Sequence, residues 1–261
     1  MLTFRVLKLQ EAPLQELVFF LDYDGSLCPH LEVWEERIYD PDEIYALVSA
    51  LKPSTTAADR NSGAREIYWN TGRRVESLAS VSDKFLEYPG YFIQGSVFWD
   101  AQSKTETVCG PLIGKDWAKF YEDQLKTEKG LRIEIKKSSL RIAAFQDGDR
   151  DQVTRFFESA KHPDLTGWQW RMGARGAELL SKDFDKRFAV RDGLKRTPGI
   201  PVVIGDDTLD APAVEEAIAR GGFAILVGEH CGWATEIEHK ASQLLYCNDV
   251  GQAKALLQSL V

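Results

Sequence analysis

Apolar residues are concentrated in short, continuous runs along this chain. The runs Leu17–Leu21 (LVFFL), 201–204 (PVVI) and Phe223–Val227 (FAILV) contain no polar position. A strand with one solvated face alternates apolar and polar residues, so unbroken runs predict strands buried on both faces, as in a parallel sheet. Two shorter apolar runs, at 67–69 and 91–93, predict further strands of the same sheet.

Segments with a helical stripe of apolar residues lie between these runs. The segment Pro41–Leu51 carries its apolar residues on one face, Asp40 is suited to cap it, and Pro53 should end it. Strands that alternate with helices imply right-handed crossovers, so we expect an α/β fold with a doubly wound parallel sheet. The other predicted helices span 117–125, 153–160, 188–194, 213–219 and 251–260.

The middle of the chain has a different pattern. Residues 131–145 begin with alternating apolar and polar positions, as in a half-buried strand, and 168–172 predicts another strand. Together with the helices expected at 117–125 and 153–160, these strands indicate an α+β insert with an antiparallel sheet.

Charge and composition exclude several classes of function. The 261 residues include 32 Lys and Arg against 40 Asp and Glu, and the resulting net charge of −8 argues against a nucleic-acid binder held by bulk charge. The longest apolar runs are far shorter than the roughly 20 residues of a membrane span, and residues 1–16 lack a signal-peptide pattern. We therefore expect a cytoplasmic protein, monomeric or weakly self-associating, with no nucleic-acid or membrane partner.

The cysteines and histidines form no recognisable site. The four cysteines lie far apart without a Cys-x-x-Cys pair, which predicts reduced thiols. The four histidines show no metal-ligand spacing, so neither a zinc site nor a Cys-His nucleophile is predicted.

Acidic residues follow two of the predicted buried strands. Asp22 and Asp24 come directly after the first strand, and Gly25 permits a tight turn beside them. Doubly wound folds place ligands at this end of the strands. An acidic strand-to-helix turn without a ligand has the same pattern, so this pair alone leaves both interpretations open.

A second acidic cluster follows the strand at 201–204. Asp206, Asp207 and Asp210 would repel one another unless a positive charge lies among them. A loop with an Asp-capped helix explains the same residues, with Asp207 or Thr208 as the cap. However, two acidic strand ends in one sheet favour a joint site for a hard cation such as Mg²⁺, which binds carboxylates together with phosphate and water.

Thr71 and Lys186 are candidate phosphate ligands. Thr71 follows the strand at 67–69, so its hydroxyl and nearby backbone N–H groups are placed to bind a phosphate oxygen. Lys186 opens a predicted helix, although a single lysine is usually a solvated surface charge.

The order of these groups is Asp-x-Asp-Gly-Ser, Thr-Gly-Arg, Lys and Gly-Asp-Asp-x-x-Asp. It resembles the four motifs of the haloacid dehalogenase-like phosphohydrolases and, more closely, those of the trehalose-6-phosphate phosphatases. Glu178, eight residues before Lys186, and the Glu134-x-Lys136 pair also match that family. The resemblance covers nearly the whole chain. It implies a Rossmannoid catalytic core at 1–103 and 179–261, with an inserted α+β cap of type C2 at 104–178 that sets substrate specificity.

The resemblance implies a role for each motif. Asp22 would attack the phosphate to form an aspartyl-phosphate, and Asp24 would act as general acid and then general base. Mg²⁺ would be held by Asp22, the main-chain carbonyl of Asp24 and Asp206, with Asp207 and Asp210 orienting the site. Thr71 and Lys186 would bind phosphoryl oxygens. The implied substrate contacts are Gly72, Arg73, Glu134, Lys136 and Glu178.

The chain departs from the family near the expected sugar position. Residues 141–144 (RIAA) stand where the family has a His-Tyr-Arg-like run, and 94–96 (QGS) replaces an Asn-Gly-Gly-like loop. Arg187 follows Lys186 where the family has glycine. The implied function is a Mg²⁺-dependent sugar-phosphate phosphatase acting on trehalose 6-phosphate. The alternatives are a phosphatase for another phosphorylated sugar or pseudo-sugar, and a non-catalytic regulatory module that keeps the fold.

Overall fold

The computed structural model describes residues 9–10, 12, 16–29, 40–52, 66–144, 150–160, 162–173, 176–228 and 242–261. The cysteine at 231 and three of the histidines considered above lie outside these ranges. The three described cysteines are free thiols, as predicted. Among the described helices, none is both long and apolar enough to cross a membrane.

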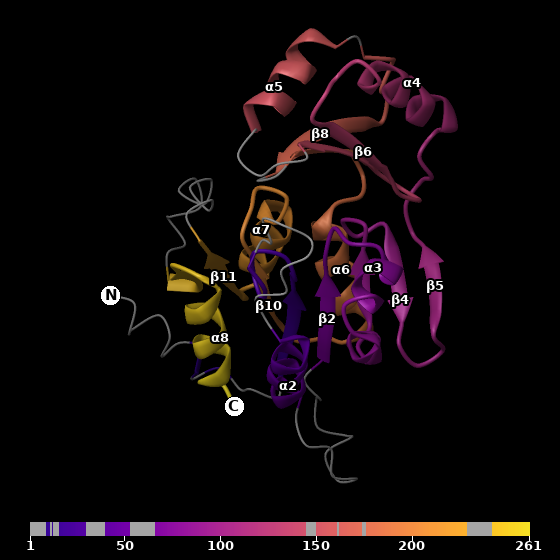
Figure 1. The fold of residues 1–261 in the computed structure, drawn as a ribbon. Helices are drawn as coiled ribbons and strands as arrows, with labels where there is room; N and C mark the ends of the chain where they lie inside the picture. The colour runs from indigo at the N-terminus through magenta and orange to yellow at the C-terminus, as the bar shows by residue number, and fades with distance from the viewer. Residues whose placement is uncertain are drawn as a thin grey trace.

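A large sheet forms the base of the molecule (Figure 1). Its described strands have the order β12-β11-β10-β1-β2-β3-β4-β5, in which all pairs from β12 to β3 are parallel and the last two pairs are antiparallel. The strands are β1 (Leu17–Leu21), β2 (Glu66–Asn70), β3 (Gly90–Phe92), β4 (Val97–Asp100), β5 (Thr105–Val108), β10 (Ile200–Gly205), β11 (Phe223–Val227) and β12 (Leu244–Cys247).

Helices cover both faces of this sheet. Phe19 and Trp69 face a core shared with α2 (Pro41–Leu51), α3 (Val75–Ala79) and α8 (Val250–Gln258). Their neighbours in sequence, Phe20 and Tyr68, face α6 (Lys186–Arg196) and α7 (Ala211–Ala219) on the opposite side. Since successive side chains of a strand point to opposite faces, the unbroken apolar runs are required by burial on both sides.

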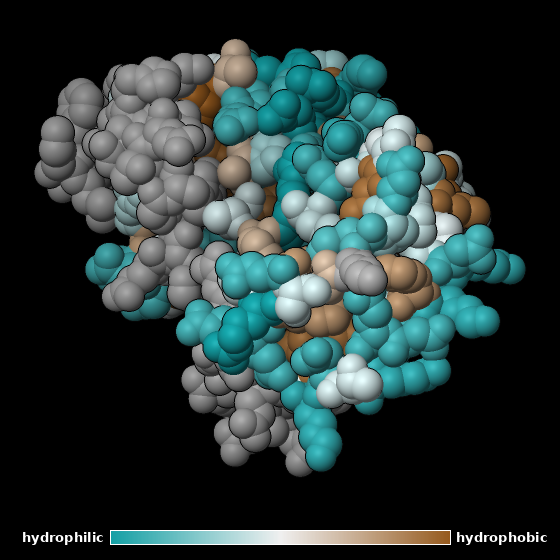
Figure 2. Space-filling model, turned by 90° about the horizontal axis from the view of Figure 1, so that it is seen from above, coloured by the Kyte–Doolittle hydropathy of each residue, from teal (hydrophilic) through white to brown (hydrophobic). Residues whose placement is uncertain are grey.

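A second, smaller sheet lies over the carboxyl ends of the large sheet's strands (Figure 1). It is antiparallel, with the order β6-β7-β9-β8, and the helices α4 (Lys115–Leu125) and α5 (Arg150–Ser159) pack on one of its faces. Its strands are β6 (Leu131–Ile135), β7 (Leu140–Ala144), β8 (Trp168–Gly173) and β9 (Gly176–Ser181). Seen from this side, the described surface is mainly hydrophilic with smaller apolar areas (Figure 2).

The predicted α/β class, with a doubly wound sheet and an α+β insert, is confirmed. The segment 131–145, read above as beginning with one strand, contains the two strands β6 and β7. The division into core and cap domains stays a prediction. The strand β5 lies inside the insert predicted at 104–178 but belongs to the large sheet. The strand β9 runs past the predicted boundary at 178 and belongs entirely to the small sheet.

Candidate active site

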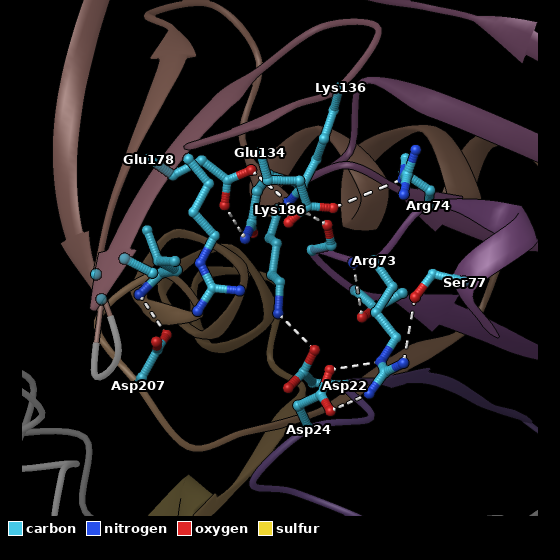
Figure 3. Close-up of a pocket in the computed structure, with 18 of the residues that line it drawn as sticks. Asp22, Asp24, Arg73, Arg74, Ser77, Glu134, Lys136, Glu178, Lys186 and Asp207 are labelled. Carbon is cyan, nitrogen blue, oxygen red and sulfur yellow. Dashed lines mark hydrogen bonds and ion pairs between the residues drawn. The ribbon is translucent and has the colours of Figure 1, made fainter. Parts of the chain in front are cut away.

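A pocket of about 800 Å³ lies between the carboxyl ends of the central strands and the small sheet (Figure 3). It collects residues that are distant in sequence because parallel strands end at the same edge of a sheet. All the predicted site residues except Asp210 line this pocket. They are Asp22, Asp24, Thr71, Gly72, Arg73, Glu134, Lys136, Glu178, Lys186, Asp206 and Asp207.

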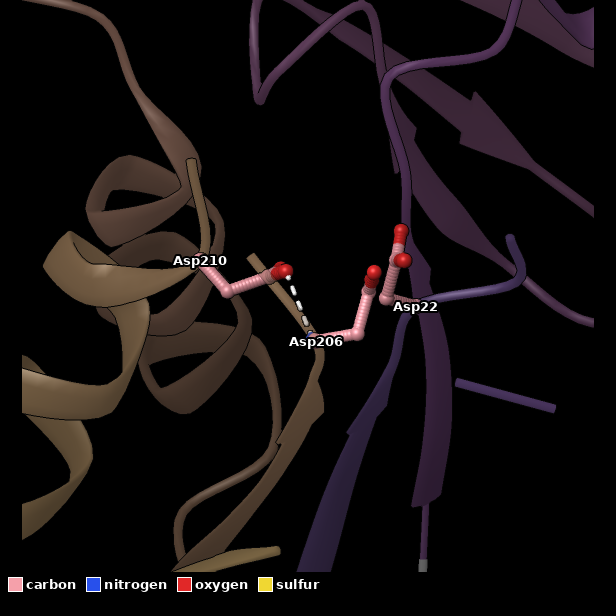
Figure 4. A group of neighbouring side chains, drawn as sticks. All are labelled: Asp22, Asp206 and Asp210. Carbon is pink, nitrogen blue, oxygen red and sulfur yellow. Dashed lines mark hydrogen bonds between the residues drawn. The ribbon is translucent and has the colours of Figure 1, made fainter. Parts of the chain in front are cut away.

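Three carboxylates meet at the floor of the site. One oxygen from each of Asp22, Asp206 and Asp210 lies within 4.8 Å of the others, and all three residues are buried (Figure 4). Asp22 and Asp206 converge because β1 and β10 are adjacent, with Leu21 opposite Ile204. The hydroxyl of Ser26 lies 3.4 Å from Asp22 Oδ2 and 3.5 Å from Asp206 Oδ1, so it bridges the two carboxylates.

Asp210 is held by the loop that carries the cluster. The backbone N–H groups of Asp206 and Asp207 donate to its Oδ2 at 3.1 and 3.3 Å. Gly205 permits this fold-back, because a side chain there would come within 2.4 Å of Asp210 Cγ. With its second oxygen bound by Lys186, Asp210 is placed to orient the loop, which leaves Asp22 and Asp206 to face the pocket.

Lys186 supplies the positive charge beside this cluster. Its Nζ donates to Asp22 Oδ1 at 2.8 Å and to Asp210 Oδ1 at 2.6 Å, and the side chain is 3% exposed. Burial alone would lower the pKa of Lys186, but Asp210 and Asp22 raise it, so the ammonium stays charged. Asp185 caps the helix that begins here by accepting from Arg187 N at 2.9 Å.

One lysine does not balance three buried carboxylates. Burial, opposed in part by Lys186, raises the pKa values of Asp22 and Asp210. Burial and the charges of Asp210 and Asp207 raise the pKa of Asp206 to about 9. A hard divalent cation favours such a set of oxygen donors and relieves this repulsion, so the cluster fits Mg²⁺.

The loop after β2 contributes Thr71 and Arg73 to the site. Arg73 donates to both oxygens of Asp24, with Nε–Oδ2 at 2.7 Å and Nη2–Oδ1 at 2.6 Å (Figure 3). Burial would lower the pKa of Arg73, but its contact with Asp24 raises it. Thr71 is buried and faces the pocket, and its Oγ1 accepts from Arg73 N at 3.2 Å. Arg73 therefore pairs with Asp24 and also lines the pocket, and its predicted contact with substrate stays a prediction.

Lys136, in the turn after β6, and Glu178 of β9 form a buried ion pair. Lys136 Nζ donates to Glu178 Oε1 at 2.9 Å and to the carbonyl of Gly72 at 2.8 Å, so the pair reaches across to the large sheet. Ser139 Oγ and Gln94 Nε2 also donate to Glu178, at 2.6 and 3.1 Å. Burial would raise the pKa of Glu178, but Lys136 and Ser139 lower it.

Two further predicted residues lie at the edges of the pocket. Glu134 Oε1 is 3.6 Å from Arg74 Nε, at the start of α3. Asp207 accepts from Leu209 N at 2.8 Å, and Thr208 donates to the carbonyl of Met172 in the small sheet. Their roles toward a ligand stay predictions.

Sequence reasoning assigned no role to three residues that the structure places here. Ser26 bridges Asp22 and Asp206, and its place four residues after Asp22 in a tight turn was the available signal. Gln94 lines the pocket with a buried Oε1 that has no partner among the described residues. Arg141 also lines it. The signal for both Gln94 and Arg141 was their departure from the resembled family.

Comparisons with known proteins agree with this fold. No protein-family profile and no curated protein matches the sequence. The C-terminal domain of C. albicans trehalose-6-phosphate phosphatase is similar, with a TM-score of 0.73 and 17% identity over 99% of this chain and 96% of that one. A trehalose-6-phosphate phosphatase related protein has a TM-score of 0.61 and 22% identity, over 94% of this chain and 96% of that one. A haloacid dehalogenase-like hydrolase from Bacteroides thetaiotaomicron has a TM-score of 0.64 and 12% identity, over 94% of this chain and 99% of that one. These likenesses establish the fold, which is haloacid dehalogenase-like.

Proposed function

From a haloacid dehalogenase-like fold with these residues at its sheet edge, we propose a Mg²⁺-dependent phosphatase that hydrolyses a sugar phosphate. The observation that carries the proposal is the placement of Asp22, whose buried carboxylate faces the pocket between Lys186 and Asp206. Asp24, held by Arg73, lines the same pocket. A nucleophile, an acid–base group and a phosphate-binding cation thus surround one space.

The residues present fit a magnesium ion. Asp22 and Asp206 would hold it, because both offer carboxylate oxygens to the pocket while those of Asp210 are bound by the protein. When bound, the ion neutralises charge between an anionic nucleophile and an anionic phosphate.

The chain's own residues supply the rest of the reaction. A carboxylate oxygen of Asp22 bonds to phosphorus while the bond from phosphorus to the leaving oxygen breaks, and Asp24 donates a proton to that oxygen. Water then attacks phosphorus, Asp24 takes its proton, and Asp22 is released. Both oxygens of Asp24 accept from Arg73, so Asp24 must loosen one of these bonds to carry the proton that it donates.

Thr71 and Lys186 are placed to stabilise the transferring group. The Lys186 ammonium and the Thr71 hydroxyl stand at the pocket floor, where the phosphoryl oxygens gain charge. Loss of one such preorganised donor typically lowers kcat by about 10²–10³-fold.

Two substrate classes have support. Trehalose 6-phosphate is supported by the likeness to structures named as trehalose-6-phosphate phosphatases, with Glu134, Lys136 and Glu178 as the sugar-side residues. A different phosphorylated sugar is favoured by Arg141 and the small Ala143 and Ala144, which line the sugar side of the pocket.

We expect the purified protein to release phosphate from at least one phosphorylated sugar, and to do so only with Mg²⁺. A panel that includes trehalose 6-phosphate, glucose 6-phosphate and acidic sugar phosphates tests this by phosphate release. A protein that binds Mg²⁺ but hydrolyses no phosphomonoester would instead support the regulatory module.

We expect the thermal stability of the Asp206→Asn variant to depend little on Mg²⁺. Without Mg²⁺ the variant should melt at a higher temperature than the wild type, because one of three repelling buried carboxylates is gone. At 100 times the Kd, Mg²⁺ should stabilise the wild type by about 2.7 kcal/mol and the variant hardly at all. Thermal melts in EDTA and in MgCl₂ measure both effects, with the exposed Asp123→Asn as control. An unchanged Mg²⁺ shift in Asp206→Asn would remove Asp206 from the metal site.

A further inference from the structure

Arg141 lies in a row of charged residues that crosses the small sheet. It is opposite Glu134 on β6 and opposite Glu178 on β9, and Arg171 on β8 is opposite Glu178 in turn. Residues directly opposite one another in an antiparallel sheet point to the same face. Glu134, Arg141 and Glu178 all line the pocket, so this row forms its wall across from the catalytic carboxylates.

The two glutamates beside Arg141 already have other partners. Glu178 Oε1 accepts from Lys136 and Ser139, and its Oε2 accepts from Gln94. The two oxygens of Glu134 lie 3.6 Å from Arg74 Nε and 3.9 Å from Lys136 Nζ. Neither carboxylate therefore depends on Arg141 for a counter-charge.

The guanidinium of Arg141 makes no hydrogen bond or ion pair with another described residue, although its charge contributes to the lowered pKa of Glu178. Arg171, the other arginine of the row, differs in this respect, because it donates to Asp185 Oδ2 at 3.0 Å. Five fixed N–H donors on a partly buried arginine that faces a pocket are suited to an anion.

The wall next to Arg141 leaves room for a ligand. Ala143, two residues further along the same face of β7, and the neighbouring Ala144 also line the pocket. Both offer only a methyl group, so the pocket of about 800 Å³ stays open beside Arg141. Among lining residues of the small sheet, three cations (Arg132, Lys136 and Arg141) stand against two carboxylates (Glu134 and Glu178).

We propose that Arg141 binds a second anionic group, a carboxylate or a further phosphate, on the leaving group of the substrate. The proposal rests on the phosphatase function above, because a phosphoryl group at Asp22 directs the rest of the substrate toward the small sheet. It selects the acidic class of phosphorylated sugars or sugar acids over a neutral sugar such as trehalose. Gln94 Oε1, buried and without a described partner in the same pocket, would accept a hydrogen bond from a hydroxyl group of the same ligand.

Matched pairs of substrates test the proposal. Phosphate release is compared between glucose 6-phosphate and 6-phosphogluconate, between glycerol 3-phosphate and 3-phosphoglycerate, and between glucose 6-phosphate and glucose 1,6-bisphosphate. The first two pairs add a carboxylate and the third adds a phosphate. We expect kcat/KM of the wild type to be at least about 10-fold higher for the acidic member of the carboxylate pairs or of the phosphate pair, since hydrogen bonds to charged groups contribute about 1.5–3 kcal/mol.

Arg141→Gln should remove this preference. We expect its kcat/KM for the acidic substrate to fall about 10–100-fold, while that for the neutral partner and for p-nitrophenyl phosphate stays within about twofold. Arg141→Lys should restore part of the preference. Lys119→Gln removes the same charge from an exposed position of α4, away from the pocket, and should leave the preference unchanged. Circular dichroism verifies that each variant is folded.

The outcomes separate this inference from the proposed function. If the wild type hydrolyses no substrate of any class, the phosphatase function fails. If it hydrolyses neutral and acidic members equally well, or keeps its preference for acidic members in Arg141→Gln, the function stands and the role of Arg141 is overturned.

Discussion

The Asp22→Asn protein is expected to hydrolyse its substrate at least about 10⁴-fold more slowly than the wild type, at the detection limit of a phosphate-release assay. An amide oxygen is a poor nucleophile and cannot form the acyl-phosphate bond, and loss of a covalent nucleophile typically has effects of this size. The variant should fold normally, because asparagine has the same shape and Lys186 keeps its 2.6 Å contact with Asp210.

A second variant distinguishes loss of the nucleophile from general damage to the site. With p-nitrophenyl phosphate, whose leaving group needs no protonation, Asp24→Asn should complete the first step and accumulate protein phosphorylated on Asp22. Mass spectrometry of acid-quenched samples detects this species, and Asp22→Asn should never form it. Full phosphate release by Asp22→Asn would refute its assignment as the nucleophile.

For Glu178→Ala we expect the second large effect, a loss of about 3–5 kcal/mol in the free energy of unfolding. The substitution leaves the ammonium of Lys136, which is 3% exposed, with the Gly72 carbonyl at 2.8 Å and Glu134 only at 3.9 Å. A buried charge without a close counter-ion is strongly destabilising. Urea denaturation measures the free energy of unfolding.

The ion pair between Lys137 and Glu106 provides a matched control. It also joins a lysine from the small-sheet region to a glutamate, here in β5, but the side chains are 47% and 21% exposed. Removing it with Glu106→Ala should change the free energy of unfolding by less than about 1 kcal/mol. Equal effects of the two substitutions would show that burial does not set the strength of the Lys136–Glu178 pair.

The effect of Glu178→Ala should also depend on pH. The pKa of Glu178 is lowered from its ordinary value of 4.5 in the folded protein, so its contribution to stability is complete above that value. The contribution is lost as the pH falls below 4.5 and through the lowered pKa. The difference in stability between the wild type and Glu178→Ala should therefore be constant at neutral pH and shrink in acid.

The central strands and the acidic cluster were predictable because both depend on local signals. A strand buried on two faces must be apolar throughout, and carboxylates that follow adjacent parallel strands meet at one edge. The turn between β6 and β7 was missed because residues 136–139 (KKSS) contain no glycine, proline or asparagine. In β9, the polar Glu178 interrupts the apolar run, and its burial is compensated by Lys136, Ser139 and Gln94, which are distant in sequence.

The partners of the site residues were beyond reach from sequence. Arg73 and Asp24 are 49 positions apart, and nothing in either motif indicates that the guanidinium contacts the carboxylate. The position of Arg141 in the pocket wall depends on the register of β7 with β6 and β9. Registers of this kind follow from the packing of the whole small sheet, which no short pattern encodes.

The loop after β2 links the position of the small sheet to the alignment of Asp24. Thr71 lines the pocket, the Gly72 carbonyl accepts from Lys136 of the small sheet, and Arg73 holds Asp24. These three residues are consecutive, so a displacement of Gly72 shifts the backbone of both of its neighbours. If the small sheet lifts, Lys136 leaves Gly72 and the alignment of Asp24 is disturbed through the adjoining peptide. The phosphatase reaction would then proceed only while the small sheet is in contact with the loop after β2. Water that entered an open site would meet a misaligned Asp24, so hydrolysis in the open state would be slow.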